Sequence, residues 1–526
     1  MKRRDFVKGV AAVPAAGALL SSSSLLSAEA GNPQAAKAAG QATSGASKTG
    51  TLPGYAGQFK SSDMYGLGPD GKPDPNYRAT GMGSSRAHTK PDPAKPHQMK
   101  LTQEEQDIMD GKKGEVLAKV MKIVVAHGNA FGADKLVDLG GALHSSMYFG
   151  VAYMAPLIKI FDECAEAGLK AYAPYTVNPR PYDVYNVNNN PKDMQLIYEG
   201  YATQRDVDWI HVRLGAPDLN YRSCACYVDE IGNAPKPGTY VAWAESSAVN
   251  YGNSVLGLRT NRNATGMELL CGLLGKAPLF GLMTDEGRRA KWLVEVKTTK
   301  EPDWGVVGTA IGQKVVEDVP YITGLDKYLG GKVTNENMHL LKAMGSATAS
   351  SGAVGLYHVD KVTPDAKEKG RKLLVEGYKT YVIDDAEQER VRGTFKNLWP
   401  KKDAKPTHCW IGCPHNTYKE LTDWGKMVTE ALKKRGQEKT AIPVILFCAN
   451  VVRDRLVEEQ PLLVGEMKRA GMKFTNMCTV SYAGMKGFSE RVFGVTNSAK
   501  TRNYSTLRYF PNDVLLEIVM TGKIPS

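Results

Sequence analysis

Regular hydrophobic periods appear only beyond about the first hundred residues of the chain. Thr102 and Glu105 have the spacing of a capping box, and apolar residues in 116–124 then recur on one face of a predicted helix. A predicted helix over residues 155–167 leads into a predicted strand at 170–173. This alternation of helix and strand predicts an α/β protein.

The same alternation continues toward the C-terminus. The predicted elements are a strand at 354–358, a helix after Pro364, a strand that ends near Gly412, a helix through 418–428, a strand at 443–447, a helix at 453–469 and a strand at 472–475. Ligands of open α/β sheets bind at the carboxyl ends of the strands. Cys413 and Cys478 each follow such a strand, which makes them candidate metal ligands.

Gly412 and Pro414 flank Cys413 and favour a tight turn with an exposed backbone. Because cysteine thiolate is the usual ligand of iron–sulfur clusters, Cys413 and Cys478, together with Cys226, indicate an iron–sulfur site. A zinc site is an alternative, although its spacing resembles no common zinc finger; its ligands would be His408, Cys409, Cys413 and His415.

The chain has eight cysteines, and in an exported protein eight cysteines allow 105 disulfide pairings. Cys164, Cys271 and Cys448 lie within apolar helix or strand patterns, which predicts that they are buried as small hydrophobic residues. Cys224 and Cys226 are separated by one residue, a spacing that makes a relaxed disulfide between them awkward.

The N-terminus carries a predicted export signal. Paired arginines precede a short apolar run at 10–20, and Ala28-Glu29-Ala30 offers a cleavage site, so residues 1–30 read as a twin-arginine signal peptide. This route serves proteins exported already folded, often with a cofactor inserted, and predicts a periplasmic or otherwise exported protein. A Sec signal that contains paired arginines is the alternative. Residues 31–100 are rich in Gly, Ala, Ser, Lys and Pro and read as a disordered tether.

Composition is that of a soluble globular protein, with 42% hydrophobic and 23% charged residues, and no apolar run is long enough for a permanent membrane span. The net charge is +12, but residues 1–100 alone hold 13 Lys and Arg against 6 Asp and Glu. The basic charge therefore belongs mostly to the leader and tether, and no nucleic-acid partner is expected.

Several segments between about residues 101 and 515 resemble the aconitase X family. The most specific are Trp243-Ala244-Glu245-Ser246 and the turn Gly412-Cys413-Pro414-His415. The others are 166–168 with 176–179, 226–235, 253–262, 350–354 and 496–500. The family includes the large subunit of phosphomevalonate dehydratase and cis-3-hydroxyproline dehydratase.

The resemblance implies an aconitase-like α/β fold with several α/β/α units, parallel sheets and no swivel domain. Residues 101–526 would form this catalytic-like region, subdivided near 320–345. It also implies a hydro-lyase that dehydrates a small hydroxy acid at an iron–sulfur cluster held by Cys226, Cys413 and Cys478. Three thiolates leave one iron open as a Lewis acid for the substrate hydroxyl.

Elimination also needs a base and groups that hold the substrate acid. The candidate catalytic residues are Glu245, Ser246 and Lys500. The candidate substrate-binding residues are His144, Asn178, Asn253, Asn261, Arg262, Asn497 and Ser498. A structural hydrogen-bonding role is the alternative for each of them.

Two departures from the family pattern stand out. The family usually follows its first cluster cysteine with a threonine-proline-tyrosine turn, whereas Tyr227-Val228-Asp229 follows Cys226 here. No segment matches the small swivelling domain with which the family's dehydratases work, so a separate swivel subunit is an expected partner. The alternatives are a non-catalytic iron–sulfur or ligand-binding protein on this scaffold and a disulfide-stapled solute-binding protein.

Overall fold

The computed structural model describes residues 97–151, 154–217, 219–483 and 491–525. The chain divides into two units, residues 1–73 and 74–526, and every element described below belongs to the second unit. The predicted signal peptide and the predicted tether up to residue 96 lie outside the described residues.

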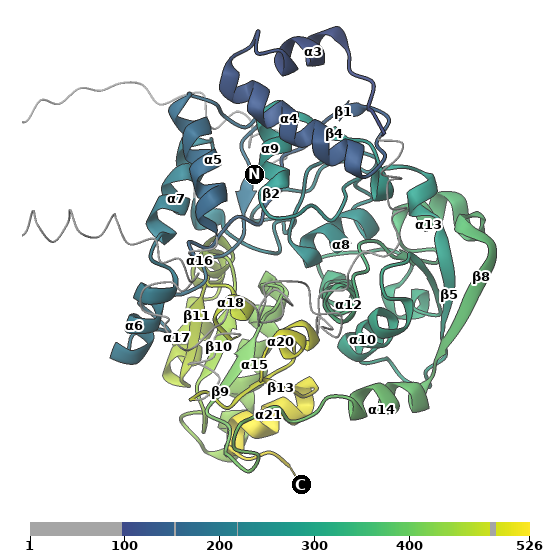
Figure 1. The fold of residues 1–526 in the computed structure, drawn as a ribbon. Helices are drawn as coiled ribbons and strands as arrows, with labels where there is room; N and C mark the ends of the chain where they lie inside the picture. The colour runs from purple at the N-terminus through teal and green to yellow at the C-terminus, as the bar shows by residue number, and fades with distance from the viewer. Residues whose placement is uncertain (1–96, 152–153, 218, 484–490, 526) are drawn as a thin grey trace, which may run out of the picture. The chain divides into compact units, whose positions relative to one another are not determined.

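The first part of this unit, up to residue 286, surrounds two short sheets with helices (Figure 1). The predicted capping box is confirmed, because Glu105 N donates to Thr102 Oγ1 and Thr102 N donates to Glu105 Oε2. The elements are α3 (Gln103–Met109), α4 (Glu115–Ala130), β1 (Leu136–Asp138), β2 (His144–Ser145), α5 (Ala155–Glu166), β3 (Thr176–Val177), α6 (Pro191–Gly200), α7 (Gln204–Arg213), α8 (Ser246–Ser254), α9 (Met267–Leu274) and β4 (Lys276–Pro278).

The second part contains a four-stranded parallel sheet with strand order β7-β6-β5-β8. Its elements are β5 (Ala290–Val296), α10 (Trp304–Val315), β6 (Pro320–Thr323), α11 (Asp326–Leu329), α12 (Met338–Ser351), β7 (His358–Val359), α13 (Pro364–Lys369), β8 (Leu374–Ile383) and α14 (Asp385–Gly393). Helices α10 and α12 pack in close contact. Only glycine fits at 308, since a Cβ there would lie 2.2 Å from the Met344 carbonyl oxygen.

The third part is a five-stranded parallel sheet with strand order β11-β10-β9-β12-β13. Its elements are β9 (His408–Ile411), α15 (Tyr418–Arg435), β10 (Val444–Phe447), α16 (Asn450–Glu459), α17 (Pro461–Arg469), β11 (Met472–Thr475), α18 (Thr479–Ala483), β12 (Gly494–Thr496), α20 (Ala499–Tyr504), β13 (Arg508–Tyr509) and α21 (Asn512–Thr521). The prediction of an α/β fold with parallel sheets is confirmed.

Helix α12 joins the three parts, because it packs against α8 of the first, α10 of the second and α20 of the third. Figure 1 shows α12 between these helices. Residues 320–345, where a subdivision was predicted, hold β6 and the start of α12.

Three predicted elements differ from the structure. Residues 170–173 form no strand, and their backbone instead bonds to the Leu214 and Gly272 carbonyls. The predicted helix at 453–469 is two helices, since Pro461 starts α17 and lacks the N–H that a continuous helix needs. The strand predicted at 354–358 shrinks to His358–Val359.

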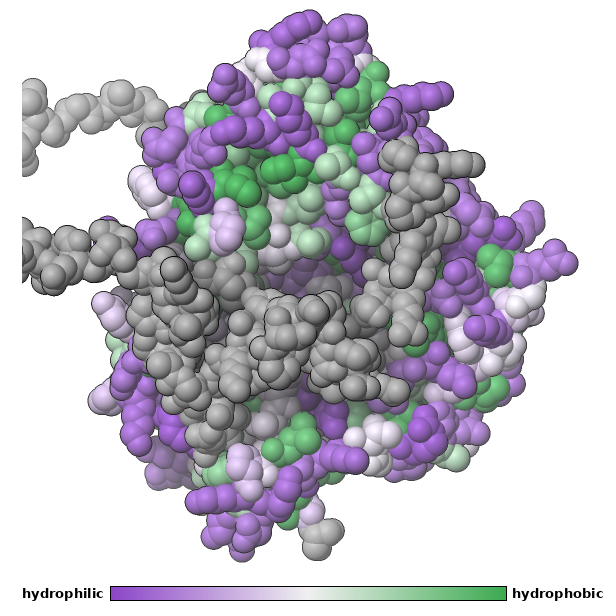
Figure 2. Space-filling model, in the orientation of Figure 1, coloured by the Kyte–Doolittle hydropathy of each residue, from purple (hydrophilic) through white to green (hydrophobic). Residues whose placement is uncertain are grey.

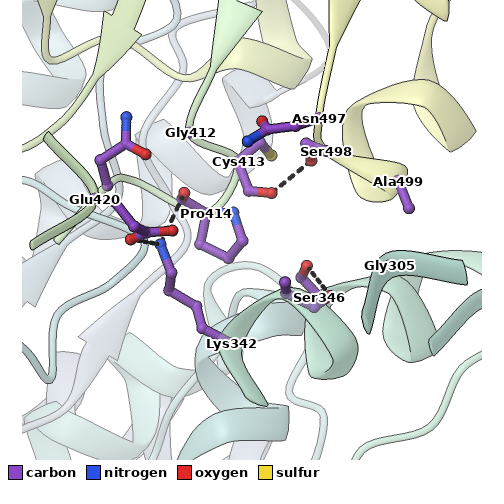
Figure 3. A pocket seen from close by; sticks show the side chains of 12 residues that line it. Gly305, Lys342, Ser346, Gly412, Cys413, Pro414, Glu420, Asn497, Ser498 and Ala499 are labelled. Atoms are coloured by element: carbon purple, nitrogen blue, oxygen red, sulfur yellow. Dashed lines mark hydrogen bonds and ion pairs between the residues drawn. The ribbon is translucent and has the colours of Figure 1, made fainter. Parts of the chain in front are cut away.

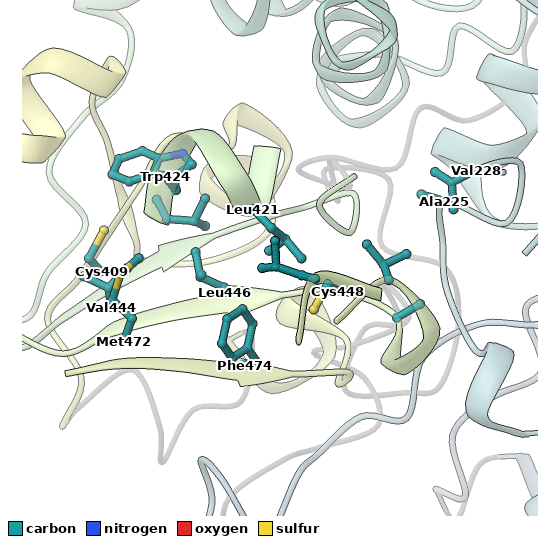
Figure 4. Packing of buried hydrophobic residues seen from close by; sticks show 14 of the residues in the cluster. Ala225, Val228, Cys409, Leu421, Trp424, Val444, Leu446, Cys448, Met472 and Phe474 are labelled. Atoms are coloured by element: carbon teal, nitrogen blue, oxygen red, sulfur yellow. The ribbon is translucent and has the colours of Figure 1, made fainter. Parts of the chain in front are cut away.

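Cys164, Cys271 and Cys448 are each 1% exposed, which confirms the prediction that they are buried. Cys409 and Cys448 pack beside Leu421 and Leu446 in the core of the third part (Figure 4). On the face shown in Figure 2, polar side chains predominate, with apolar ones gathered over α4 and α5. Within the described residues, the structure contains no helix with the length and apolar character of a membrane span.

Candidate functional site

The carboxyl ends of the parallel strands β9, β11 and β12 meet at one edge of the five-stranded sheet. Cys413 follows β9, Cys478 follows β11, and Asn497 and Ser498 follow β12. Figure 3 shows Cys413, Asn497 and Ser498 close together at this edge. The strand-end positions predicted for the two cysteines are therefore those of the structure.

The turn that carries Cys413 requires glycine before it. Gly412 has a φ of +108°, and a Cβ there would lie 2.5 Å from Asn416 Nδ2 and 2.7 Å from the Phe447 carbonyl oxygen. Ser498 Oγ donates a hydrogen bond of 2.5 Å to the Cys413 carbonyl oxygen. The turn is thus fixed by contacts with two neighbouring strand ends.

Helix α12 fixes the same turn from the second part of the unit. Lys342 Nζ donates to the His415 carbonyl oxygen at 2.7 Å and pairs with Glu420 Oε2 at 2.6 Å, and its side chain is only 2% exposed. A cavity of about 50 Å³ lies between α12 and Cys413 (Figure 3). A space of this size holds water rather than a substrate, so it marks the seam between the two parts. Lys342 was not selected from the sequence. Its only sequence signal is that it is a charged residue among the small and apolar residues of α12.

Cys224, which comes from the first part of the unit, lies beside this turn. The His415 backbone N–H donates to Cys224 Sγ at 3.3 Å. Burial raises the pKa of Cys224 well above its usual value, and the nearby Glu245 and Cys413 raise it further. Cys413 in turn has Cys478 as an electrostatic neighbour, and its pKa rises to about 11, mainly through burial. The three thiols therefore form a connected group.

Solvent access separates these three cysteines from the other five. Cys224, Cys413 and Cys478 are partly exposed, whereas the remaining cysteines are buried, and all eight are free. The structure thus places Cys224, and not the predicted Cys226, beside Cys413. Cys226 is 0% exposed and packs in the core, close to the Thr176 hydroxyl.

A buried ion pair between Glu245 and Lys500 borders the thiols. Glu245 is the N-cap of α8, where it accepts from the Ala248 N–H at 2.8 Å and from Ser247 Oγ at 2.5 Å, and it also contacts Lys500 Nζ. The Ser246 hydroxyl donates to Glu245 Oε1 at 3.3 Å. The side chains of Glu245 and Lys500 are 10% and 7% exposed. The three predicted catalytic residues therefore lie together.

The electrostatics keep both members of this pair charged. Burial alone would raise the pKa of Glu245, but the Lys500 ammonium and the hydrogen bonds outweigh it and lower that pKa to about 2. Burial opposes the charge of Lys500, yet Glu245 and the thiols Cys413 and Cys224 raise its pKa above the usual value. Lys500 thus places a permanent positive charge beside two of the three partly exposed cysteines.

His144 and Asn178 lie together on the parallel pair β2–β3. His144 Nε2 is 3.0 Å from Asn178 Oδ1, and His144 Nδ1 is 2.9 Å from Thr176 Oγ1. Burial lowers the pKa of His144 to about 4, although Glu245 nearby raises it in part. His144 is therefore a neutral, fully engaged residue behind Glu245.

Three predicted substrate-binding residues lie elsewhere or are already engaged. Asn253 bonds to the backbone of Thr260 and to the Gly355 carbonyl oxygen. Asn261 and Arg262 line a separate cavity of about 400 Å³ at the seam between the first two parts, and the lining of the cavity beside Cys413 includes neither of them. Both asparagines satisfy backbone groups, a role that their residue type alone does not reveal.

The three thiols do not form a site for a single metal ion. Among the residues that the structure describes, no three His, Cys, Asp or Glu side chains are arranged to hold one metal ion together. An iron–sulfur cluster needs less closeness, because it contains several metal atoms and its cysteine ligands do not all bind the same one. Three cysteines on partly exposed residues, two of them beside a lysine ammonium, have the chemistry of such a ligand set, so Cys224, Cys413 and Cys478 fit a cluster.

Fold and site together define an α/β protein that gathers thiols from separate loops at the edge of a parallel sheet. The model for the aconitase X first domain matches residues 98–286, and that for the second domain matches residues 290–393. The chain belongs to the aconitase X family.

Named relatives agree with this assignment. The phosphomevalonate dehydratase large subunit of Thermococcus kodakarensis is 31% identical over 68% of this chain and 82% of its own length. The cis-3-hydroxy-L-proline dehydratase of Hypocrea jecorina is 27% identical over 77% of this chain and 65% of its own. A crystal structure of Thermococcus kodakaraensis aconitase X, described as the holo-form, matches with a TM-score of 0.64 at 27% identity and covers 80% of this chain and all of that one. The predictions of the family, the aconitase-like fold and a hydro-lyase are confirmed.

Proposed function

We propose that the protein is an exported iron–sulfur hydro-lyase that removes water from a small hydroxy acid, with Cys224, Cys413 and Cys478 as the cluster ligands. The observation that carries the proposal is that these three residues are partly exposed whereas the other five cysteines are buried. They come from the first part of the unit and from the ends of β9 and β11. Dehydratase names among the relatives support the reaction class.

The cluster would supply a Lewis acid for the leaving hydroxyl of the substrate. Lys500 would hold the substrate carboxylate, because it stays protonated beside Cys413 and Cys224. Glu245, whose carboxylate is held by Lys500 and by the Ala248 N–H, would orient Lys500. Asn497 and Ser498 follow β12 at the same edge of the sheet as Cys413 and would contact the substrate from that side.

We further propose that a separate small subunit completes the site and that residues 1–30 direct export by the twin-arginine route. Several relatives are named as large subunits, which supports a partner chain. Replacing Arg3 and Arg4 by lysine is expected to leave the protein in the cytoplasm on cell fractionation. Export of that variant would favour a Sec signal.

The proposed cluster is tested by purifying the mature chain without oxygen and measuring iron and acid-labile sulfide. Serine at position 224, 413 or 478 is expected to abolish most of both, because each substitution removes one thiolate. Cys226→Ala is the matched control, since it lies two residues from Cys224 and should retain the cluster. Loss of iron in Cys226→Ala with retention in Cys224→Ser would overturn the ligand assignment.

Activity is tested on the cluster-loaded protein, alone and with candidate small subunits, by following the new carbon–carbon double bond in ultraviolet absorbance. Hydroxyproline-like and phosphorylated hydroxy acids form the first panel, following the names of the relatives. A loaded protein that dehydrates no member of the panel with any partner would favour a non-catalytic iron–sulfur protein.

A further inference from the structure

A tyrosine hydroxyl from the first part of the unit lies within hydrogen-bonding distance of the sulfur of Cys478. Tyr148 Oη is 3.7 Å from Cys478 Sγ and 2.6 Å from Ser481 Oγ. Gln204 holds the Tyr148 backbone in place, since its Nε2 donates to the Tyr148 carbonyl oxygen at 2.9 Å and its Oε1 accepts from the Gly150 N–H at 3.0 Å. The hydroxyl is therefore fixed by an element outside the cysteine loop.

The chemistry of the three groups sets the direction of the hydrogen bonds. Tyr148 has one hydroxyl proton, and Ser481 has another. A ligating cysteine is a thiolate, which accepts hydrogen bonds and donates none. Once Cys478 is a ligand, the Tyr148 proton therefore points to Sγ, and the Ser481 proton points to Tyr148 Oη.

We propose that Tyr148 is a positioning residue that donates a hydrogen bond to the Cys478 thiolate and, with Ser481 behind it, tunes the cluster. This inference rests on the proposed cluster and adds to it a residue that touches no substrate. A hydrogen bond to a cluster sulfur withdraws negative charge from it and so favours the reduced cluster, which raises the reduction potential.

The chain offers a matched control for the loss of a hydroxyl group. Tyr201 Oη donates to the Ser481 carbonyl oxygen at 3.1 Å, so it binds the same short segment through its main chain. Both tyrosines pack against the loop that carries Cys478. Phenylalanine at either position keeps the ring and removes only the oxygen.

The experiment compares the full wild-type chain, loaded with its cluster without oxygen, with the variants Tyr148→Phe and Tyr201→Phe. Each sample is assayed for iron and sulfide and then titrated with a reductant while the cluster is followed by electron paramagnetic resonance. We expect Tyr148→Phe to keep its iron and sulfide but to shift to a more negative potential. Tyr201→Phe should titrate with the wild type.

A second variant tests the same hydrogen bond if Tyr148→Phe folds poorly. Ser481→Ala removes the donor behind Tyr148 Oη and should shift the potential in the same direction by a smaller amount. Equal potentials in the wild type, Tyr148→Phe and Ser481→Ala would overturn the inference while leaving the proposed cluster intact. A wild-type chain without iron or sulfide would instead overturn the proposed function itself.

Discussion

The substitution Lys500→Met tests whether the buried pair with Glu245 stabilises the fold. Methionine matches much of the lysine volume but leaves the Glu245 carboxylate with no cation at a position where it is 10% exposed. Breaking a buried ion pair on one side costs roughly 3–5 kcal/mol. The expected loss in the free energy of unfolding is therefore several kcal/mol.

The pH dependence gives an independent measure of the same interaction. The pKa of Glu245 falls from 4.5 to about 2 on folding. A depressed carboxyl pKa stabilises the native state above the unfolded value and loses that contribution as the pH falls through the native one. The stability of the wild type should therefore decline by about 3 kcal/mol from this group between pH 4.5 and pH 2.

In Lys500→Met, burial becomes the main influence on Glu245 and raises its pKa, so the stability of the variant should increase as the pH is lowered from neutrality. Urea unfolding from pH 7 to pH 2, with iron removed beforehand by a chelator, measures both effects. The double variant Glu245→Gln with Lys500→Met should recover much of the loss, because it leaves no buried charge. The buried ion pair would be refuted if Lys500→Met lost less than about 1 kcal/mol of unfolding free energy and showed the same pH dependence as the wild type.

Three further predictions follow from the structure. Gly412→Ala should lose roughly 2 kcal/mol or more of stability and most of its iron, because alanine disfavours the positive φ and its Cβ would contact Asn416 Nδ2. Urea unfolding and iron assays check this prediction. Gly393→Ala is the control, since a Cβ at position 393 meets nothing within 4 Å. Burial raises the pKa of Glu268 from 4.5 to about 7. The free energy of unfolding of the wild type should therefore fall by about 3 kcal/mol as the pH rises from 4.5 to 7, because the buried carboxyl group must then ionise. Glu268→Gln should remove this dependence of the unfolding free energy on pH. A variant with the same pH dependence as the wild type would contradict the raised pKa of Glu268. Lys342→Met should lower the free energy of unfolding by about 2–3 kcal/mol, because it leaves Glu420 without its cation. An unchanged free energy of unfolding would contradict the role of Lys342 in holding the turn that carries Cys413.

Strand ends were the part of the site that the sequence could predict. Cys413 and Cys478 follow short apolar strands, and parallel pairing brings such ends to one edge whatever the rest of the chain does. The pair Glu245–Lys500 joins residues that lie in different parts of the unit. Each residue was a candidate by its type, but no periodic pattern shows that the two meet.

The choice between Cys224 and Cys226 depended on a loop without periodicity. Side chains two residues apart in an irregular segment point in directions that only the folded backbone decides. One signal was nevertheless present: the family turn places a tyrosine three residues after its cysteine, and Tyr227 lies three residues after Cys224. Counting back from the tyrosine would have selected the thiol that the structure places beside Cys413.

Each of the three cysteines is contacted by a group from a different segment of the chain. The His415 N–H donates to Cys224 Sγ, Ser498 bonds to the Cys413 carbonyl oxygen, and Tyr148 contacts Cys478 Sγ. Because these contacts cross between loops, the position of each cysteine depends on a neighbouring loop. Loss of the Ser498 hydroxyl, which holds the Cys413 turn, should therefore lower the occupancy of the whole proposed cluster rather than release a single ligand, and partial loss of iron should be accompanied by a proportional loss of sulfide.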